Sequence, residues 1–400
     1  MPIPKSSLWW RDSNQTASGK TGAVHNQFSS DNAAPLDQPE ARGVNCNLMS
    51  QTLQTVITSE CPNNLTTDKH MRVVIANSTE AELHHGCWRV MSNIRRALAE
   101  RGAEVIASHK AGTDWRDDRN FRTALANADA LLVNGEGTIH SDRPAGLNLL
   151  ELSEEARRAG IYSALVNFSW AGMSGRHSSS LHDFNLIAAR ETRSRAELVE
   201  LGIEVELMAD MSLAYPDTPT KAKQGIGWTD SVLSPVARRL HMLARGAGWS
   251  HVPIQTPPGS GMFRRRHLAF ADLARPARMF QNLRLDLAIH RDAERCPTSY
   301  LSSIAGLEGL VTGRFHAICL AILVGTPFLA VESNTHKISA LVADAGLSPE
   351  RVVEQARVDQ LAPNLEVPPW TPGERSAVES YVEWAHAANA RIFDRFVLRR

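Results

Sequence analysis

The chain changes character near residue 70. Residues 1–70 are rich in Ser, Thr, Asn and Gln, contain few aliphatic residues, and show neither helical nor strand periodicity. Such a composition favours a mostly disordered N-terminal extension. From residue 71 onward, short apolar runs alternate with segments in which apolar residues recur at helical spacing. The pattern therefore predicts an ordered body made of alternating strands and helices.

The first half of this body predicts a parallel sheet. Apolar runs predict strands at residues 71–76, 104–108, 130–134, 162–168, 186–189 and 205–208. Helical spacing predicts helices at residues 88–101, 119–128, 149–159 and 193–201. Strand, helix and strand in this order indicate right-handed βαβ units, whose helices cover both faces of the sheet.

A polar stretch containing Pro and Lys, residues 215–223, predicts a linker, after which the alternation resumes. The next strands are predicted at residues 225–228, 251–255, 285–290, 309–311 and 327–331. The next helices are predicted at residues 232–245, 316–324, 337–345 and, closing the chain, 373–396. The expected fold class is α/β, with two Rossmann-like, doubly wound parallel-sheet domains facing a cleft.

These boundaries define the expected domains. We expect residues 71–215 to form the N-terminal domain and residues 222–365 to form the C-terminal domain. Residues 372–400 are expected to contribute a C-terminal helix, which could cross back to the first domain.

Charge and cysteine content narrow the functional classes. The chain carries 43 basic and 43 acidic residues, and this balance argues against a nucleic-acid partner. Its five cysteines are scattered and odd in number, as expected of free thiols in a reducing compartment. No signal-peptide pattern or membrane-spanning apolar run occurs, so we expect a cytoplasmic protein. Arg264, Arg265 and Arg266 leave open a peripheral contact with the inner face of a membrane.

Candidate chemistry gathers where the predicted strands end, which is the ligand-binding edge of an open parallel sheet. The polar and glycine residues at these ends are His84, His85, Gly135, Glu136, Gly137, Thr138, His140, Arg190, Arg314, His316 and Lys337. This set is basic and rich in histidine, although the chain as a whole is neutral. Arg314 and His316 also lie at the start of a predicted helix, where the helix dipole attracts anions. The sequence therefore predicts a site for a small anionic substrate.

Other interpretations of these residues stay open. Residues 135–137 could form only a tight turn, and Arg190 with Glu191 could be a solvated ion pair. His84, His85 and Cys87 resemble half of a metal site, but no second ligand pair has suitable spacing, so we expect no metal. The P-loop, the dinucleotide-binding glycine pattern and the hydrolase nucleophile elbow are all absent from the sequence.

The region around His316 resembles the C-terminal signature of the polysaccharide pyruvyl transferases. That family shows an Arg-Leu-His-Ala helix start, then Gly-x-Pro before the next strand, and then a Lys. Here residues 314–317 read Arg-Phe-His-Ala, residues 325–327 read Gly-Thr-Pro, and Lys337 follows. The upstream segments 135–137, 189–191 and 209–210 agree in order. Glu136 departs from the family by replacing the middle residue of a Gly-Gly-Gly turn.

The resemblance implies a fold similar to that of GT-B glycosyltransferases and a defined reaction. The pyruvate unit of phosphoenolpyruvate would move onto two hydroxyls of a sugar as a ketal, with release of phosphate, during surface or exopolysaccharide biosynthesis. Phosphoenolpyruvate would be the donor substrate, and no cofactor is implied. The acceptor would be a saccharide or a lipid-linked saccharide on the side of the N-terminal domain, residues 71–215, and the donor would lie on the side of the C-terminal domain, residues 222–365. The sequence indicates no particular oligomeric state.

The resemblance also suggests roles for the candidate residues. Arg190, Arg314 and Lys337 would bind the carboxylate and phosphate of the donor, because arginine forks bind both groups bidentately. His316 would be the general acid that protonates the enol carbon. The base is open among Glu136, His140 and Glu191. The candidate catalytic residues are His316, Arg314 and Glu136. The candidate substrate-binding residues are Arg190, Lys337, Gly135, Gly137, Thr138, His140 and His85.

Two rival functions share this sequence pattern. A GT-B-type glycosyltransferase that uses a nucleotide sugar would have the same two-domain build and a basic C-terminal site. A non-catalytic carbohydrate-binding relative would account for the altered glycine turn at Glu136.

Overall fold

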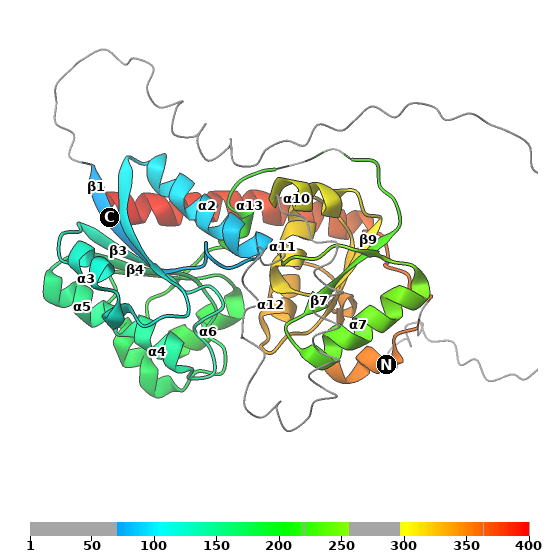
Figure 1. Ribbon diagram of the computed structural model, residues 1–400, viewed down its shortest axis with the longest axis horizontal. Coiled ribbons are helices and arrows are strands. Elements are labelled where there is room, and N and C mark those ends of the chain that lie inside the picture. The colour runs from blue at the N-terminus through cyan, green and yellow to red at the C-terminus, as the bar shows by residue number, and fades with distance from the viewer. Residues whose placement is uncertain (1–69, 218, 220, 256–296, 363, 400) are drawn as a thin grey trace, which may run out of the picture. The chain divides into compact units, whose positions relative to one another are not determined.

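A computed structural model describes residues 70–217, 219, 221–255, 297–362 and 364–399 (Figure 1). The predicted N-terminal extension, the predicted strand at residues 285–290 and Arg264 to Arg266 lie outside these residues, apart from His70. Among the described residues, every helix is too short or too polar to cross a lipid bilayer.

The first sheet is six-stranded and parallel. Its strands are β1 (Met71–Ser78), β2 (Ala103–Lys110), β3 (Ala130–Asn134), β4 (Tyr162–Phe168), β5 (Leu186–Ala189) and β6 (Glu206–Leu207). They are arranged in the order β2-β1-β3-β4-β5-β6. The helices between them are α2 (His85–Ala99), α3 (Arg119–Leu125), α4 (Pro144–Leu150), α5 (Leu152–Ala159) and α6 (Thr192–Glu200).

Helices cover both faces of this sheet because its central strands are apolar on both sides. Val73 and Ile75 pack in the core that α2 covers, together with Met91 of that helix. Val74 packs in the opposite core, together with Phe121 of α3. Successive side chains of a strand point to opposite faces, so an uninterrupted apolar run requires cover on both.

The second sheet is five-stranded, parallel and wound in the same way. Its strands are β7 (Ile226–Ser231), β8 (Ser250–His251), β9 (Gly309–Gly313), β10 (Phe328–Val331) and β11 (Val352–Val353), in the order β11-β10-β9-β7-β8. Its helices are α7 (Ser234–Ala247), α10 (Pro297–Ala305), α11 (Phe315–Leu323) and α12 (Lys337–Asp344). Leu310 and Val311 of β9 pack in different cores, so this sheet is also covered on both faces. Two doubly wound parallel sheets confirm the predicted fold class.

The last helix, α13 (Pro372–Leu398), joins the two cores (Figure 1). Thr371 and Glu374 form a capping box that fixes where the helix begins. Tyr381 packs in the core beside the second sheet, whereas Phe393 and Phe396 pack in the core beside the first. Helix α13 therefore contributes to the cores of both sheets.

Several predicted elements have different bounds in the structure. The strand predicted at residues 251–255 is limited to β8, since Pro253 has no N–H to donate to a neighbouring strand. The helix predicted at residues 149–159 is two helices, α4 and α5, which meet at Glu151. Helix α10 and strand β11 were not predicted.

Candidate active site

Both sheets present polar side chains at the point where their winding reverses. In each sheet the first strand lies between the second and the third. The chain therefore continues toward one edge of the sheet after the first strand and toward the other edge after the third. Ligands of open α/β sheets bind at the carboxyl ends of such strands. Thr79 and Glu136 follow β1 and β3 in the first sheet. Asp230 lies near the end of β7, and Arg314 follows β9, in the second.

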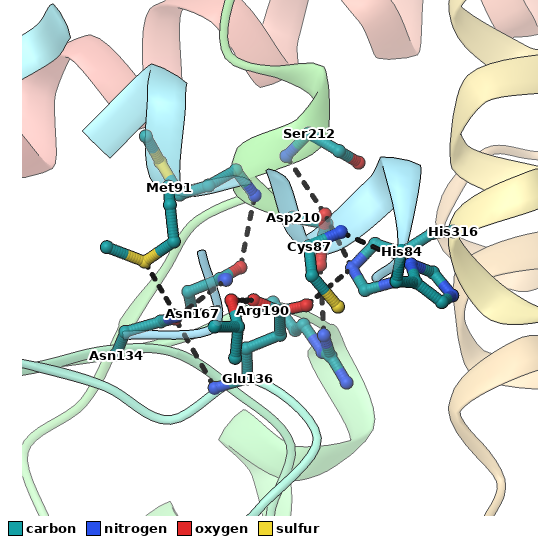
Figure 2. A network of polar contacts seen from close by, with 12 residues as sticks. His84, Cys87, Met91, Asn134, Glu136, Asn167, Arg190, Asp210, Ser212 and His316 are labelled. Atoms are coloured by element: carbon teal, nitrogen blue, oxygen red, sulfur yellow. Dashed lines mark hydrogen bonds and ion pairs between the residues drawn. The ribbon is translucent and has the colours of Figure 1, made fainter. Parts of the chain in front are cut away.

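A contact between Glu136 and His316 connects these two sets of strand ends (Figure 2). His316 lies in the first turn of α11, and its Nε2 is 3.1 Å from Glu136 Oε1 and 3.8 Å from Asp210 Oδ1. His316 is 9% exposed and Glu136 is 3% exposed. His316 Nε2 and Glu136 Oε1 are close enough for an ion pair, but they are not aligned for a hydrogen bond. Two candidate catalytic residues that are far apart in sequence are thus brought together.

Glu136 is held as a carboxylate. Its Oε2 accepts hydrogen bonds from Thr79 Oγ1 at 2.8 Å and from Asn134 Nδ2 at 3.3 Å. Burial alone would raise the pKa of Glu136, but the charge on a protonated His316 and the Thr79 hydrogen bond lower it well below its usual value. Glu136 is therefore an anion at neutral pH and stabilises positive charge on His316.

The start of α2 packs directly against His316. A Cβ atom at Gly86 would lie 2.3 Å from His316 Cβ, so only glycine allows this approach. The ring of His84, which caps the helix, lies 5.4 Å from the His316 ring. The ring of His85, the first residue of α2, stacks on Tyr300 of α10 at 4.5 Å. The structure therefore places this candidate residue against α10.

The two candidate arginines are each bound by a buried aspartate. Arg314 donates from Nε to Asp230 Oδ1 at 2.7 Å, and its second guanidinium nitrogen donates to Oδ2. Arg190 donates to Asp210 Oδ2 at 2.9 Å, and its guanidinium carbon lies 4.3 Å from the centre of the Phe315 ring. These pairs fix the orientation of both guanidinium groups, which also keep further N–H donors for a ligand.

Sequence reasoning did not single out Asp230. The predicted strand ended at residue 228, whereas β7 continues to Ser231 and places this carboxylate at its carboxyl end. The sequence signal that could have identified Asp230 is the presence of an acidic residue two positions beyond the end of a predicted strand.

Positive charge is concentrated around Lys337 and His140. Burial and the charges of Arg190, Arg314 and Arg143 lower the pKa of Lys337 to about 8. Burial and the charges of Arg143, Lys337 and Arg190 lower the pKa of His140 to about 4. Each of these groups is harder to protonate because its neighbours are already cationic. A bound anion would relieve this repulsion, as the sequence predicts for a site that binds an anionic substrate.

The turn at residues 135–137 has a structural role. Gly135 packs against Phe168, and a Cβ atom there would lie 2.3 Å from Phe168 Cβ. Gly137 has a φ of +64°, which favours glycine. Thr138 Oγ1 accepts a hydrogen bond from Asn77 Nδ2 at 3.0 Å. These contacts fix the turn that carries Glu136.

Glu191, the remaining candidate base, is used at the start of α6. Its carboxylate accepts a hydrogen bond from the Ser194 N–H at 2.9 Å and lies 3.5 Å from His336 Nε2. It therefore caps a helix and contacts the loop before α12.

One group of side chains has the composition of a metal site. His84, Cys87 and His316 each offer a ligand atom, and these atoms lie within 4.8 Å of one another. The sequence expectation of no metal rested on the lack of a second ligand pair at suitable spacing. His316 brings a third potential ligand atom from a distant part of the chain, which sequence spacing does not reveal.

Comparison with known proteins assigns the family. A family model described as polysaccharide pyruvyl transferase matches residues 62–335, more than half of the 400-residue chain. The chain belongs to the polysaccharide pyruvyl transferase family. The resemblance inferred from its motifs is confirmed. The matched region contains Glu136, Arg190, Arg314 and His316, and it ends before Lys337.

This family member was also compared with curated sequences and with solved structures. No curated protein sequence matches it. Similar solved structures include the UDP-GlcNAc 2-epimerase of Methanocaldococcus jannaschii, which is 12% identical, with a TM-score of 0.43 over 82% of this chain and 100% of that chain. The UDP-GlcNAc 2-epimerase of Neisseria meningitidis, bound to UDP-GlcNAc, is 11% identical, with a TM-score of 0.44 over 82% of this chain and 100% of that chain. A functionally uncharacterised protein of Klebsiella pneumoniae is 12% identical, with a TM-score of 0.39 over 78% of this chain and 99% of that chain.

Proposed function

We propose that this protein transfers the pyruvate unit of phosphoenolpyruvate to two hydroxyls of a saccharide or lipid-linked saccharide, forming a cyclic ketal and releasing phosphate. The observation that carries the proposal is the buried pair of His316 and Glu136, 3.1 Å apart, in a chain of this family. A histidine held beside a carboxylate is suited to donate a proton and to recover it.

Donor binding would use the cationic groups around this pair. Phosphoenolpyruvate carries a carboxylate and a phosphate, and both are bound well by arginine. Arg190 and Arg314 are already oriented by Asp210 and Asp230, so little side-chain entropy is lost when they bind the donor. Lys337 supplies further positive charge. These roles match those expected from the family signature.

The chemistry begins with transfer of a proton from His316 to the methylene carbon of the donor, which turns the methylene into a methyl group. The adjacent carbon becomes oxocarbenium-like, and the first sugar hydroxyl attacks it. The neutral imidazole of His316 then accepts the proton of that hydroxyl. Glu136 stabilises the imidazolium before and after this exchange.

Closure of the ketal releases phosphate. The bond between carbon and the phosphate oxygen breaks, and a second oxocarbenium-like centre forms. The second hydroxyl attacks this centre, and its proton leaves on hydrogen phosphate. One donor and one diol therefore give one ketal and one hydrogen phosphate, with all protons accounted for.

The test is acceptor-dependent phosphate release from phosphoenolpyruvate, with galactosides, glucosides and N-acetylmannosamine glycosides as acceptors. Mass spectrometry of the product should show the addition of pyruvate with loss of water. His316→Gln should lower the rate by about 10²–10⁴-fold, the range for loss of a general acid. His241→Gln is the matched control, since that ring packs on Trp228.

Two results would contradict the proposal. One is an undiminished rate in folded His316→Gln protein. The other is release of a nucleoside diphosphate from a nucleotide sugar, with no phosphate released from phosphoenolpyruvate by any acceptor.

A further inference from the structure

Three potential metal ligands meet where the starts of α2 and α11 pack together (Figure 2). His84 and Cys87 are three residues apart, so they lie on the same face of the first turn of α2. His84 Nδ1 accepts a hydrogen bond from the Cys87 N–H at 3.3 Å, which holds the His84 ring beside Cys87. His316 contributes the third ligand from the first turn of α11. The close approach at Gly86 brings the two helices together.

Negative charge beside these ligands favours a cation. Glu136 Oε1 lies 3.1 Å from His316 Nε2, and both atoms are buried without an aligned hydrogen bond. A cation bound to His316 would therefore lie close to the Glu136 carboxylate and would be attracted by it.

The donor set selects the class of cation. One thiolate and two imidazoles suit a borderline ion such as Zn²⁺, whereas Mg²⁺ and Ca²⁺ prefer oxygen ligands. A buried divalent ion also needs compensating negative charge. The Cys87 thiolate and the Glu136 carboxylate together supply two negative charges. The thiol proton is released to solvent when the ion binds.

We propose that His84, Cys87 and His316 bind a borderline divalent cation such as Zn²⁺, and that the bound ion inhibits the enzyme. A bound ion would occupy the lone pair of His316 that otherwise carries the transferred proton. The inhibitory part rests on the proposed function of His316 as the proton donor. The binding part rests only on the geometry of the three ligands.

Binding is tested on the full-length protein after removal of metal with a chelator. Titration with Co²⁺ should produce a thiolate-to-cobalt absorption band and the visible bands of a tetrahedral site, and Zn²⁺ should abolish both. Cys87→Ser should lose the thiolate band. Cys319→Ser is the matched control and should keep it, because Cys319 is the other cysteine in the described residues. Absence of the band in the wild-type protein, or its persistence in Cys87→Ser, would overturn the proposal.

A second measurement needs no variant and therefore does not depend on the folding of one. Iodoacetamide labelling of the wild-type protein, mapped by peptide mass spectrometry, should show that Zn²⁺ protects Cys87. Cys87 is partly exposed, and its labelling in the metal-free protein provides the reference. Equal labelling of Cys87 with and without Zn²⁺ would rule out thiolate ligation.

Inhibition is measured as the ratio of rates with and without Zn²⁺ in each protein. Saturating Zn²⁺ should slow the wild-type enzyme by at least about tenfold, since a general acid contributes more than that. Cys87→Ser should lose this sensitivity. A cobalt–thiolate band together with an unchanged rate would refute the inhibition alone. Failure of the transferase reaction itself would leave the spectroscopic result to stand independently.

Discussion

Lys337 differs from the two arginines in how its charge is balanced. Arg190 and Arg314 are each paired with a buried aspartate, whereas Lys337 donates a hydrogen bond to Asn334 Oδ1 at 3.4 Å. Among the residues that the structure describes, Lys337 forms no ion pair with a carboxylate. Its charge is therefore available to a ligand, and its protonation should control how tightly an anion binds.

We expect donor binding to weaken as the pH rises through about 8, the pKa of Lys337. Burial and the charges of Arg190, Arg314 and Arg143 lower this pKa, while Glu332 partly opposes them. Loss of the proton removes the charge that attracts the donor, so KM for phosphoenolpyruvate should increase between about pH 7 and 9. A phosphate monoester loses its second proton near pH 6, so the donor does not change charge in this window. Steady-state kinetics across this range would measure the effect.

Replacement of Lys337 provides the control. Lys337→Arg keeps the positive charge throughout this pH range, so KM should no longer depend on pH there. Lys337→Met removes the charge and should give a high KM at every pH. A wild-type KM that stays constant from pH 7 to 9 would show that Lys337 does not bind the donor.

At the scale of the elements, the sequence was most informative about which residues follow strands. The carboxyl ends of parallel strands share one edge, so the residues that follow the predicted strands include Glu136, Arg190 and Arg314. Asp230 is not among them because β7 extends beyond its predicted end. It could not place His84 near His316, because that contact depends on how α2 packs against α11.

The packing of α2 on α11 makes Gly86 sensitive to substitution. In Gly86→Ala the new methyl group would lie 2.3 Å from His316 Cβ, well inside van der Waals contact. We expect His316 to move away from Glu136, with a loss of turnover and a destabilisation of about 1–3 kcal/mol from overpacking. Rate measurements and chemical denaturation would test both effects.

Gly373→Ala is the matched control. Gly373 lies in the first turn of α13, and a Cβ atom there would meet no other atom within 4 Å. Alanine is also the better helix former, so this variant should be as stable as the parent or slightly more stable. Equal activity of the two alanine variants would show that the position of His316 tolerates a shift of α2.

At the scale of the whole described molecule, two sheets with the same winding order share one C-terminal helix. The sequence predicted both sheets from their alternating elements, and it placed a long helix at the end of the chain. It could not show that this helix enters both cores, because the apolar residues of α13 do not form a single stripe that would identify one partner. Phe393 and Tyr381 of this one helix belong to different cores.

The shared helix predicts that the two halves unfold together. Phe393 is 1% exposed beside the first sheet, and its truncation in Phe393→Ala should cost about 3–5 kcal/mol. Leu398→Ala changes an apolar residue of the same helix that is 59% exposed, so it should cost less than about 0.5 kcal/mol. Because α13 also packs in the second core, Phe393→Ala should lower the melting temperature of one cooperative transition. Two separate transitions, of which only the first moves to a lower temperature, would instead mean that the two cores unfold independently.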